Sequence, residues 1–328
     1  MAQARRRQPR RRRYRYRLKR LTPLVVAVAV AGLAGAWVGS RQPSASIEAG
    51  AHGALAASQP AAQRTPAQKT APEHLLTAGS LLSHTFTPAL LASAAILVDD
   101  DTGRVLWELN AHERRPVAST TKIMTALLAM RKLKPHDIVT VAPSVPRVPL
   151  VREGLRAGER VPAWKIFYSM LLYSGNDDAL ALAIAAGGDK WSFVHEMNAE
   201  AQKLGLNDTH FVSPSGVVDR GNYSSAWDLA ALTRVALRNP RFKAIVRTKV
   251  EHVSWSAPTY AKIYINNNRL LSEYPGANGV KTGYTHKAGP CLVASATRNG
   301  RTLIAVVLNS SNMYADATRL LNLGFASL

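Results

Sequence analysis

Apolar residues recur with two different spacings along this 328-residue chain. Short apolar runs at residues 94–98 and 105–107 flank the turn-forming Asp101-Thr102-Gly103, which predicts two paired strands. Helical spacing then predicts helices at residues 120–130, 166–173, 178–186, 191–204 and 226–237. Strand patterns return at residues 250–255, 260–266, 279–285, 292–297 and 303–308, before a last helix at 315–325. Strands at both ends of a helical insert predict an α+β fold whose sheet is closed by the N- and C-terminal segments.

An uncharged apolar run occupies residues 24–38, ahead of the globular part. Fifteen residues at ~1.5 Å each reach roughly 22 Å as a helix, less than a hydrocarbon core of ~30 Å. With basic residues before it and small residues at 34–36, the run is typical of a secretory signal peptide cleaved before Trp37. An uncleaved membrane anchor is the alternative. In both cases the positive charge predicts that the rest of the chain is extracytoplasmic.

The net charge of +21 is concentrated in the basic tail, residues 1–20, which carries 11 of these charges. A nucleic-acid-binding arm would not explain the adjoining apolar run, so we expect no nucleic-acid partner. Residues 40–84 are rich in Ala, Pro, Ser and Gln and predict a linker. We therefore divide the chain into the tail, a signal or anchor segment at 21–39, this linker, and a globular domain at 85–328.

Several kinds of chemistry find no support in the sequence. The single cysteine, Cys291, lies in a predicted strand and is expected to be a small core residue. After His195-Glu196, the position where a zinc-binding helix needs its second histidine holds Ala199. We expect neither a metal nor a cofactor.

Ser119 and Lys122 stand three residues apart at a predicted helix start, in Ser-Thr-Thr-Lys. That spacing places both side chains on one face of the helix. An alcohol needs a base to become a nucleophile, and a lysine can serve if burial or nearby cations lower its pKa. For an isolated pattern of this kind, a helix-capping serine and a surface lysine would be the simpler interpretation.

Two further motifs follow along the chain. Ser174-Gly175-Asn176 ends a predicted helix and offers a hydroxyl for proton relay and an amide to hold a carbonyl or orient Lys122. Lys281-Thr282-Gly283 lies on a predicted strand, where lysine and threonine can bind a carboxylate and Gly283 leaves room for a substrate. The three motifs occur in the order Ser-x-x-Lys, Ser-x-Asn, Lys-Thr-Gly, which argues against coincidence.

With these motifs the chain resembles the D-alanyl-D-alanine carboxypeptidases, low-molecular-mass penicillin-binding proteins of the serine β-lactamase-like superfamily. Residues 98–130, 173–182 and 268–292 carry the resemblance, which extends over about 91–325. It implies a β-lactamase/D,D-peptidase-like fold, with an antiparallel sheet and an inserted helical subdomain. It also makes residues 85–328 a catalytic domain that acts on peptidoglycan stem peptides and is acylated by β-lactam antibiotics.

The resemblance also implies a role for each motif residue. Ser119, deprotonated by Lys122, would attack the carbonyl between two terminal D-alanines. Ser174 would pass the proton to the leaving amine, and Asn176 would position the substrate amide. Lys281 and Thr282 of the strand motif would hold the terminal carboxylate. The backbone amides of Ser119 and Tyr284 would bind the oxyanion. No metal takes part.

Three alternatives stay open at this point. A D,D-endopeptidase would use the same residues on cross-links, and residues 310–315 lack the arginine with which relatives commonly bind the carboxylate. A β-lactamase is disfavoured because no Glu-x-x-Leu-Asn segment follows the second motif. A non-catalytic penicillin-binding wall module is disfavoured because every motif member is retained. If the N-terminal segment is not cleaved, the membrane is a further partner.

Overall fold

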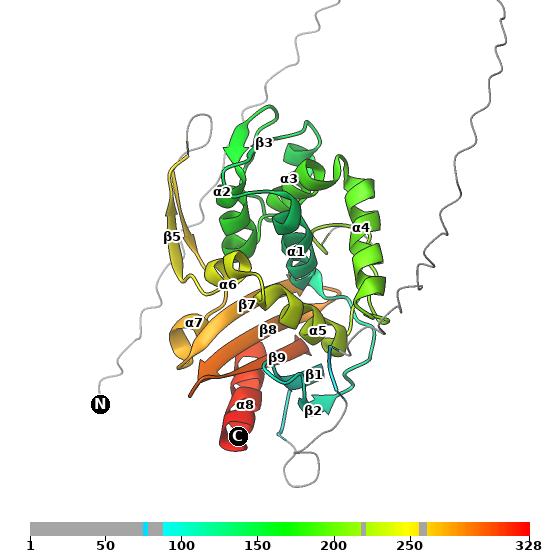
Figure 1. Ribbon diagram of the computed structural model, residues 1–328, viewed down its shortest axis with the longest axis vertical. Coiled ribbons are helices and arrows are strands. Elements are labelled where there is room, and N and C mark those ends of the chain that lie inside the picture. The colour runs from blue at the N-terminus through cyan, green and yellow to red at the C-terminus, as the bar shows by residue number, and fades with distance from the viewer. Residues whose placement is uncertain (1–74, 78–87, 218–220, 256–260) are drawn as a thin grey trace, which may run out of the picture. The chain divides into compact units, whose positions relative to one another are not determined.

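The computed structural model describes residues 75–77, 88–217, 221–255 and 261–328 (Figure 1). The predicted basic tail, signal or anchor segment and linker lie outside these residues, apart from residues 75–77. All described residues belong to one unit, Ala67–Leu328. Within the described residues, no helix has both the length and the apolar character needed to cross a membrane.

An antiparallel sheet of five strands runs through this unit in the order β2-β1-β9-β8-β7 (Figure 1). Its strands are β1 (Ala92–Asp99), β2 (Val105–Leu109), β7 (Ala277–Thr285), β8 (Gly289–Arg298) and β9 (Arg301–Ser310). Strand β1 pairs with β9, Leu97 lying opposite Ala305, and so joins the two ends of the described chain. The predicted sheet built from N- and C-terminal segments is therefore confirmed.

Successive residues of the central strands enter two different cores, as the alternation of side chains in a strand requires. Ile96 of β1 and Val306 of β9 belong to a core shared with the inserted helices. Their neighbours Leu97 and Val307 belong to a second core beneath α8 (Met313–Ala326). The sheet is thus covered on both faces, which explains why its central strands are almost continuously apolar.

The helices predicted from apolar spacing are present. The other helices are α1 (Lys122–Lys132), α2 (Ala163–Tyr168), α3 (Asn176–Gly187), α4 (Lys190–Lys203), α5 (Ala226–Leu237), α6 (Pro240–Val246) and α7 (Leu270–Glu273). Helix α5 packs on β1 and β9, while α1, α3 and α4 pack together to form most of the inserted helical region (Figure 1).

Two of these helices adjoin segments that depart from regular α-helical geometry, and these segments lie at the sequence motifs. A 3₁₀ turn, η1 (Ala118–Thr121), precedes α1, and a π-helical segment, η3 (Ser169–Tyr173), follows α2. Segments of π-helix are rare and are frequently found at functional sites. The 3₁₀ turn contains Ser119 and the π-helical segment ends directly before Ser174, two residues for which the sequence predicts a chemical role.

Short elements complete the helical region. They are β3 (Ile138–Thr140), β4 (Arg160–Pro162), η2 (Val145–Arg147), β5 (Val250–Val253) and β6 (Lys262–Ile265). Strands β5 and β6 pair as the predicted strands at 250–255 and 260–266, although residues 256–260 lie outside the described residues. Strands β3 and β4 were not predicted, because three residues are too few to show a period.

Candidate active site

Ser119 and Lys122 meet where the 3₁₀ turn η1 passes into α1. The Nζ atom of Lys122 lies 2.8 Å from the Oγ atom of Ser119, and both residues are buried. Ala118, directly before Ser119, has φ 48°, a left-handed conformation that is uncommon for a residue with a Cβ atom. The turn therefore holds Ser119 in a strained local backbone, as is often seen at functional sites.

The second motif converges on the same amine. Lys122 Nζ lies 2.8 Å from Oδ1 of Asn176 and 3.4 Å from Oγ of Ser174. Ser174 takes a left-handed conformation, φ 77°, at the end of η3, and Asn176 begins α3. This sharp change of direction turns both side chains toward Lys122, so residues that are 52 and 54 positions away in sequence share one hydrogen-bonded group.

The surroundings of Lys122 favour its neutral form. Burial, and then the charge of nearby Lys281, hold the pKa of Lys122 well below its usual value, while Asp178 and Asp177 oppose the shift. A neutral amine can accept the hydroxyl proton of Ser119 across the 2.8 Å contact. Burial likewise lowers the pKa of Lys281 to about 7.

Strand β7 lies directly against the turn that carries Ser119. A Cβ atom on Gly283 would lie only 3.0 Å from the backbone nitrogen of Ser119, so the missing side chain allows the close approach. Lys281 is buried and donates to the carbonyl oxygen of Thr282 at 3.1 Å, whereas Tyr284 is exposed. Gly283 pairs with Cys291 on β8, where burial raises the pKa of the thiol to about 11.

A cleft of about 510 Å³ opens at Ser119. Among the predicted site residues, Ser119, Asn176 and Tyr284 line it. The other lining residues are Pro116, Leu150, Val151, Gly216, Val217, Gly221, Asn222, Thr285, His286 and Lys287. The cleft is therefore lined by the start of α3, by Leu150 and Val151 between η2 and β4, by the end of β7 with the turn after it, and by the segment around Gly216.

Sequence reasoning missed the segment around Gly216. The carbonyl oxygen of Ser215 lies 3.5 Å from Lys122 Nζ and is a fourth polar group around that amine. Gly216 has φ 74°, and a Cβ atom there would overlap the carbonyl oxygen of Ala118. The run Ser213-Pro214-Ser215-Gly216 signals a turn, but nothing in the sequence shows which helix start it touches.

A second missed feature is a group of acidic residues behind the amine. Burial, and then neighbouring Asp177 and Glu153, raise the pKa of Asp178 well above its usual value. Ser169 bridges the group, with Oγ 2.5 Å from Asp178 and 3.2 Å from Glu153. Lys262 of β6 pairs with Glu153 at 2.6 Å. Asp178 is therefore held in its protonated form more readily than an ordinary carboxyl, which limits the negative charge facing Lys122.

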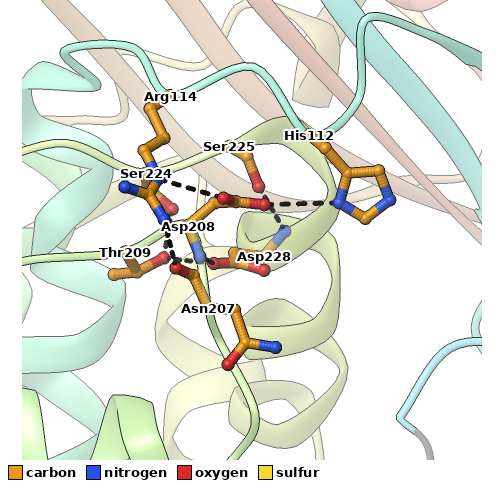
Figure 2. Close-up of polar contacts among 8 residues, drawn as sticks. All are labelled: His112, Arg114, Asn207, Asp208, Thr209, Ser224, Ser225 and Asp228. Atoms are coloured by element: carbon orange, nitrogen blue, oxygen red, sulfur yellow. Dashed lines mark hydrogen bonds and ion pairs between the residues drawn. The ribbon is translucent and has the colours of Figure 1, made fainter.

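The loop between β2 and η1 is fixed by a separate polar network (Figure 2). Asp208 accepts from Arg114 Nε at 3.0 Å and lies 3.3 Å from His112 Nδ1. Its own backbone N–H donates to Asp228 of α5 at 2.8 Å, and the His112 ring stacks on Trp227. The chain that leads to Ser119 is thus tied to α5, which itself packs on the sheet.

The fold and this site define a class of protein, and comparison with known proteins identifies it as the serine D,D-peptidases. The family model described as D-alanyl-D-alanine carboxypeptidase matches residues 83–312, and the chain belongs to this family. The predictions of a serine peptidase and of its fold class are confirmed at this level.

Individual relatives agree with the assignment. D-alanyl-D-alanine carboxypeptidase DacF of Bacillus subtilis is 36% identical over 244 residues, which cover 72% of this chain and 62% of the relative, less than two thirds of its length. The D-alanyl-D-alanine carboxypeptidase of Streptomyces sp. strain K15 is 36% identical over 279 residues, covering 77% of this chain and 94% of that protein. The crystal structure of the Streptomyces K15 DD-transpeptidase superposes with a TM-score of 0.70 at 34% identity, covering 74% of this chain and 99% of that one.

Replacement of Gly216 by alanine should disturb Ser119 without changing Ser119 itself. The new Cβ atom would overlap Ala118 and Thr121, so the turn that carries Ser119 must shift. We expect acylation by a fluorescent penicillin to slow at least tenfold and the free energy of unfolding to fall by roughly 2 kcal/mol. Stopped labelling reactions and urea unfolding measure the two effects. The control is Gly158→Ala, which has a similar φ of 79° with nothing near its Cβ position and should keep its acylation rate.

Proposed function

We propose that this chain is a D-alanyl-D-alanine carboxypeptidase that removes the terminal D-alanine from peptidoglycan stem peptides through an acyl-enzyme on Ser119. The observation that carries the proposal is the buried Lys122 amine, 2.8 Å from Ser119 Oγ and favoured in its neutral form. A hydroxyl paired with a base of lowered pKa is the arrangement that activates a serine nucleophile.

The first half of the reaction forms the acyl-enzyme. The Ser119 hydroxyl gives its proton to Lys122 Nζ, and Oγ bonds to the carbonyl carbon of the penultimate D-alanine. The oxyanion lies between the backbone amides of Ser119 and Tyr284, a stabilisation worth about 3 kcal/mol for each donor. The carbon–nitrogen bond then breaks, and the proton passes from Lys122 through Ser174 to the leaving D-alanine nitrogen. Ser174 Oγ, 3.4 Å from Nζ, is suitably close to act as this relay.

The second half returns the enzyme to its starting state. Water gives a proton to Lys122, and its oxygen bonds to the acyl carbon. The bond between that carbon and Ser119 Oγ then breaks, Lys122 returns the proton to Oγ, and the shortened peptide leaves. Asn176 holds the substrate amide near the amine, while Lys281 and Thr282 hold the terminal carboxylate. The proton that leaves with D-alanine in the first half is replaced in the second half by one from water, and the proposed steps use side chains and water alone, without a metal or cofactor.

The proposed place of action is outside the cytoplasm, where peptidoglycan lies. The basic residues followed by the apolar run at 24–38 support export, and the same segment would attach the protein to the membrane if it were not cleaved. The linker at residues 40–84 would let the catalytic domain reach the wall. β-Lactams would act as inhibitors by acylating Ser119.

The second candidate function is a D,D-endopeptidase that cuts cross-links. The segment at residues 310–315 contains no arginine, and the adjoining Asp316 is buried and paired with Arg319 at 3.0 Å. Recognition of a free carboxylate would therefore depend mainly on Lys281 and Thr282, which favours an enzyme that tolerates an amide in place of the carboxylate.

Incubation of the full chain with a pentapeptide and with cross-linked muropeptide dimers separates the two functions. We expect free D-alanine from the pentapeptide and slower cleavage, or none, of the dimers, with both products measured by mass spectrometry. Ser119→Ala is the matched control for each substrate. Cleavage of dimers without release of D-alanine would assign the endopeptidase function instead.

A further inference from the structure

Leu150 has two properties that stability alone does not explain. Its side chain is apolar yet 65% exposed, and its backbone has φ 68°, the left-handed region that disfavours residues with a Cβ atom. A glycine or an asparagine would remove the strain, and a polar residue would suit the exposure better. Residues held in strained backbone conformations cluster at active sites and at positions that clamp a ligand.

Leu150 lies where a ligand of the proposed enzyme would bind. It lines the catalytic cleft together with Ser119, Asn176 and Tyr284. Val151, the next residue along, is also exposed and lines the same cleft. Leu150 and Val151 therefore give the cleft that contains Ser119 an exposed apolar part of its lining.

The backbone on both sides of Leu150 is hydrogen-bonded to Asn176, which also contacts Lys122. Asn176 Nδ2 donates to the carbonyl oxygen of Pro149 at 3.2 Å, and its backbone N–H donates to that of Val151 at 2.8 Å. The same Asn176 places its Oδ1 atom 2.8 Å from Lys122 Nζ. One residue thus fixes both the amine that activates Ser119 and the backbone that presents Leu150.

A second anchor follows three residues later. The Asp177 carboxylate accepts the backbone N–H groups of Glu153 at 2.8 Å, Gly154 at 2.8 Å and Leu155 at 3.2 Å. The segment from Pro149 to Leu155 is therefore held at both ends by α3, and its exposed apolar side chains cannot relax into the core. Its geometry is set in advance of substrate binding, which reduces the entropy lost on association.

We propose that Leu150 is a specificity-determining residue that packs against the aliphatic groups of the acyl-donor peptide. The assignment rests on the proposed carboxypeptidase function. Asn176, beside it, is the residue proposed to hold the donor amide, so the isobutyl group of Leu150 meets the peptide on the same side of the scissile bond. Burial of one leucine side chain against such groups favours the bound state.

The test compares the variants Leu150→Gly, Leu150→Ala and Leu150→Met. For the glycine and alanine variants we expect the KM for pentapeptide to rise about tenfold with kcat unchanged, whereas methionine stays within twofold of wild type. Acylation by 6-aminopenicillanic acid, a β-lactam with no peptide-like side chain, should change less than twofold in all three. Leu150→Gly should also unfold at the same temperature as wild type or higher, because it relieves the strained φ.

The control for the backbone effect is Asn299→Gly, in the turn between β8 and β9, which also replaces a residue of positive φ, 50°, and should leave KM unchanged. Glycine and alanine variants with the wild-type KM would overturn the inference while leaving the carboxypeptidase proposal intact. Parallel losses in KM for pentapeptide and in acylation by 6-aminopenicillanic acid would also overturn it, because they would indicate a distorted site. A wild-type enzyme that is acylated but releases no D-alanine would overturn both proposals.

Discussion

Ser119→Ala should abolish covalent labelling by a fluorescent penicillin and lower the release of D-alanine from pentapeptide by a factor on the order of 10⁴ to 10⁶. The alanine variant keeps the backbone amide that would bind the oxyanion but has no atom that can bond to the acyl carbon. The substitution removes only one buried hydroxyl, that of Ser119, which lies 2.8 Å from Lys122 Nζ. We therefore expect the fold to persist. Labelling is measured on denaturing gels and the fold by circular dichroism.

The matched control for this variant is Ser215→Ala. Ser215 contacts Lys122 through its backbone carbonyl, 3.5 Å from Nζ, and the substitution leaves that oxygen in place. We therefore expect labelling within a few-fold of wild type. Labelling that persisted in Ser119→Ala would place the nucleophile elsewhere and would refute the assignment of the whole site.

The local parts of the site could be predicted from sequence because their geometry depends on spacing alone. Ser119 and Lys122 lie three residues apart at a helix start, and that spacing brings their side chains together in any helical turn. The apolar alternation on β1 and β9 likewise depends only on the period of two residues in a strand. For the same reason the sheet, and the helices that cover it, matched their predicted ranges closely.

Other parts depend on contacts between distant segments, which no local pattern encodes. Gly216 was missed because its requirement for glycine comes from Ala118, almost a hundred residues earlier in the chain. Leu150 lies in a segment with no periodic pattern, and its left-handed backbone is set by hydrogen bonds from Asn176. The raised pKa of Asp178 follows from burial beside Asp177 and Glu153, and burial cannot be deduced from the order of residues alone.

Lys122→Met should slow acylation by penicillin by about 10³- to 10⁴-fold, the range expected when a positioned base is removed. Methionine has a similar length and is apolar, so it can occupy the buried space without a charge. In the wild type, the rate should rise with pH as the amine loses its proton, with the rise at a pH well below 10.5 because the pKa of Lys122 is lowered. The variant has no such group, and its small residual rate should not show this rise. Stopped labelling reactions from pH 5 to 10 measure both.

The free energies of unfolding of wild type and of Lys122→Met, compared across pH, distinguish the loss of a base from damage to the fold. In wild type, the folded state has the lower lysine pKa, so between that pKa and 10.5 the unfolded chain binds more protons and stability rises with pH. Below the folded pKa the cost of burying the cation is present in full. Lys122→Met carries no such cost. The free energy of unfolding of the variant minus that of wild type should therefore be larger at pH 5.5 than at pH 9, which means that the variant gains stability relative to wild type toward acid. A variant that is slow but shows no relative gain toward acid would mean that Lys122 is charged in the folded enzyme across this range, and it could not then be the base that activates Ser119.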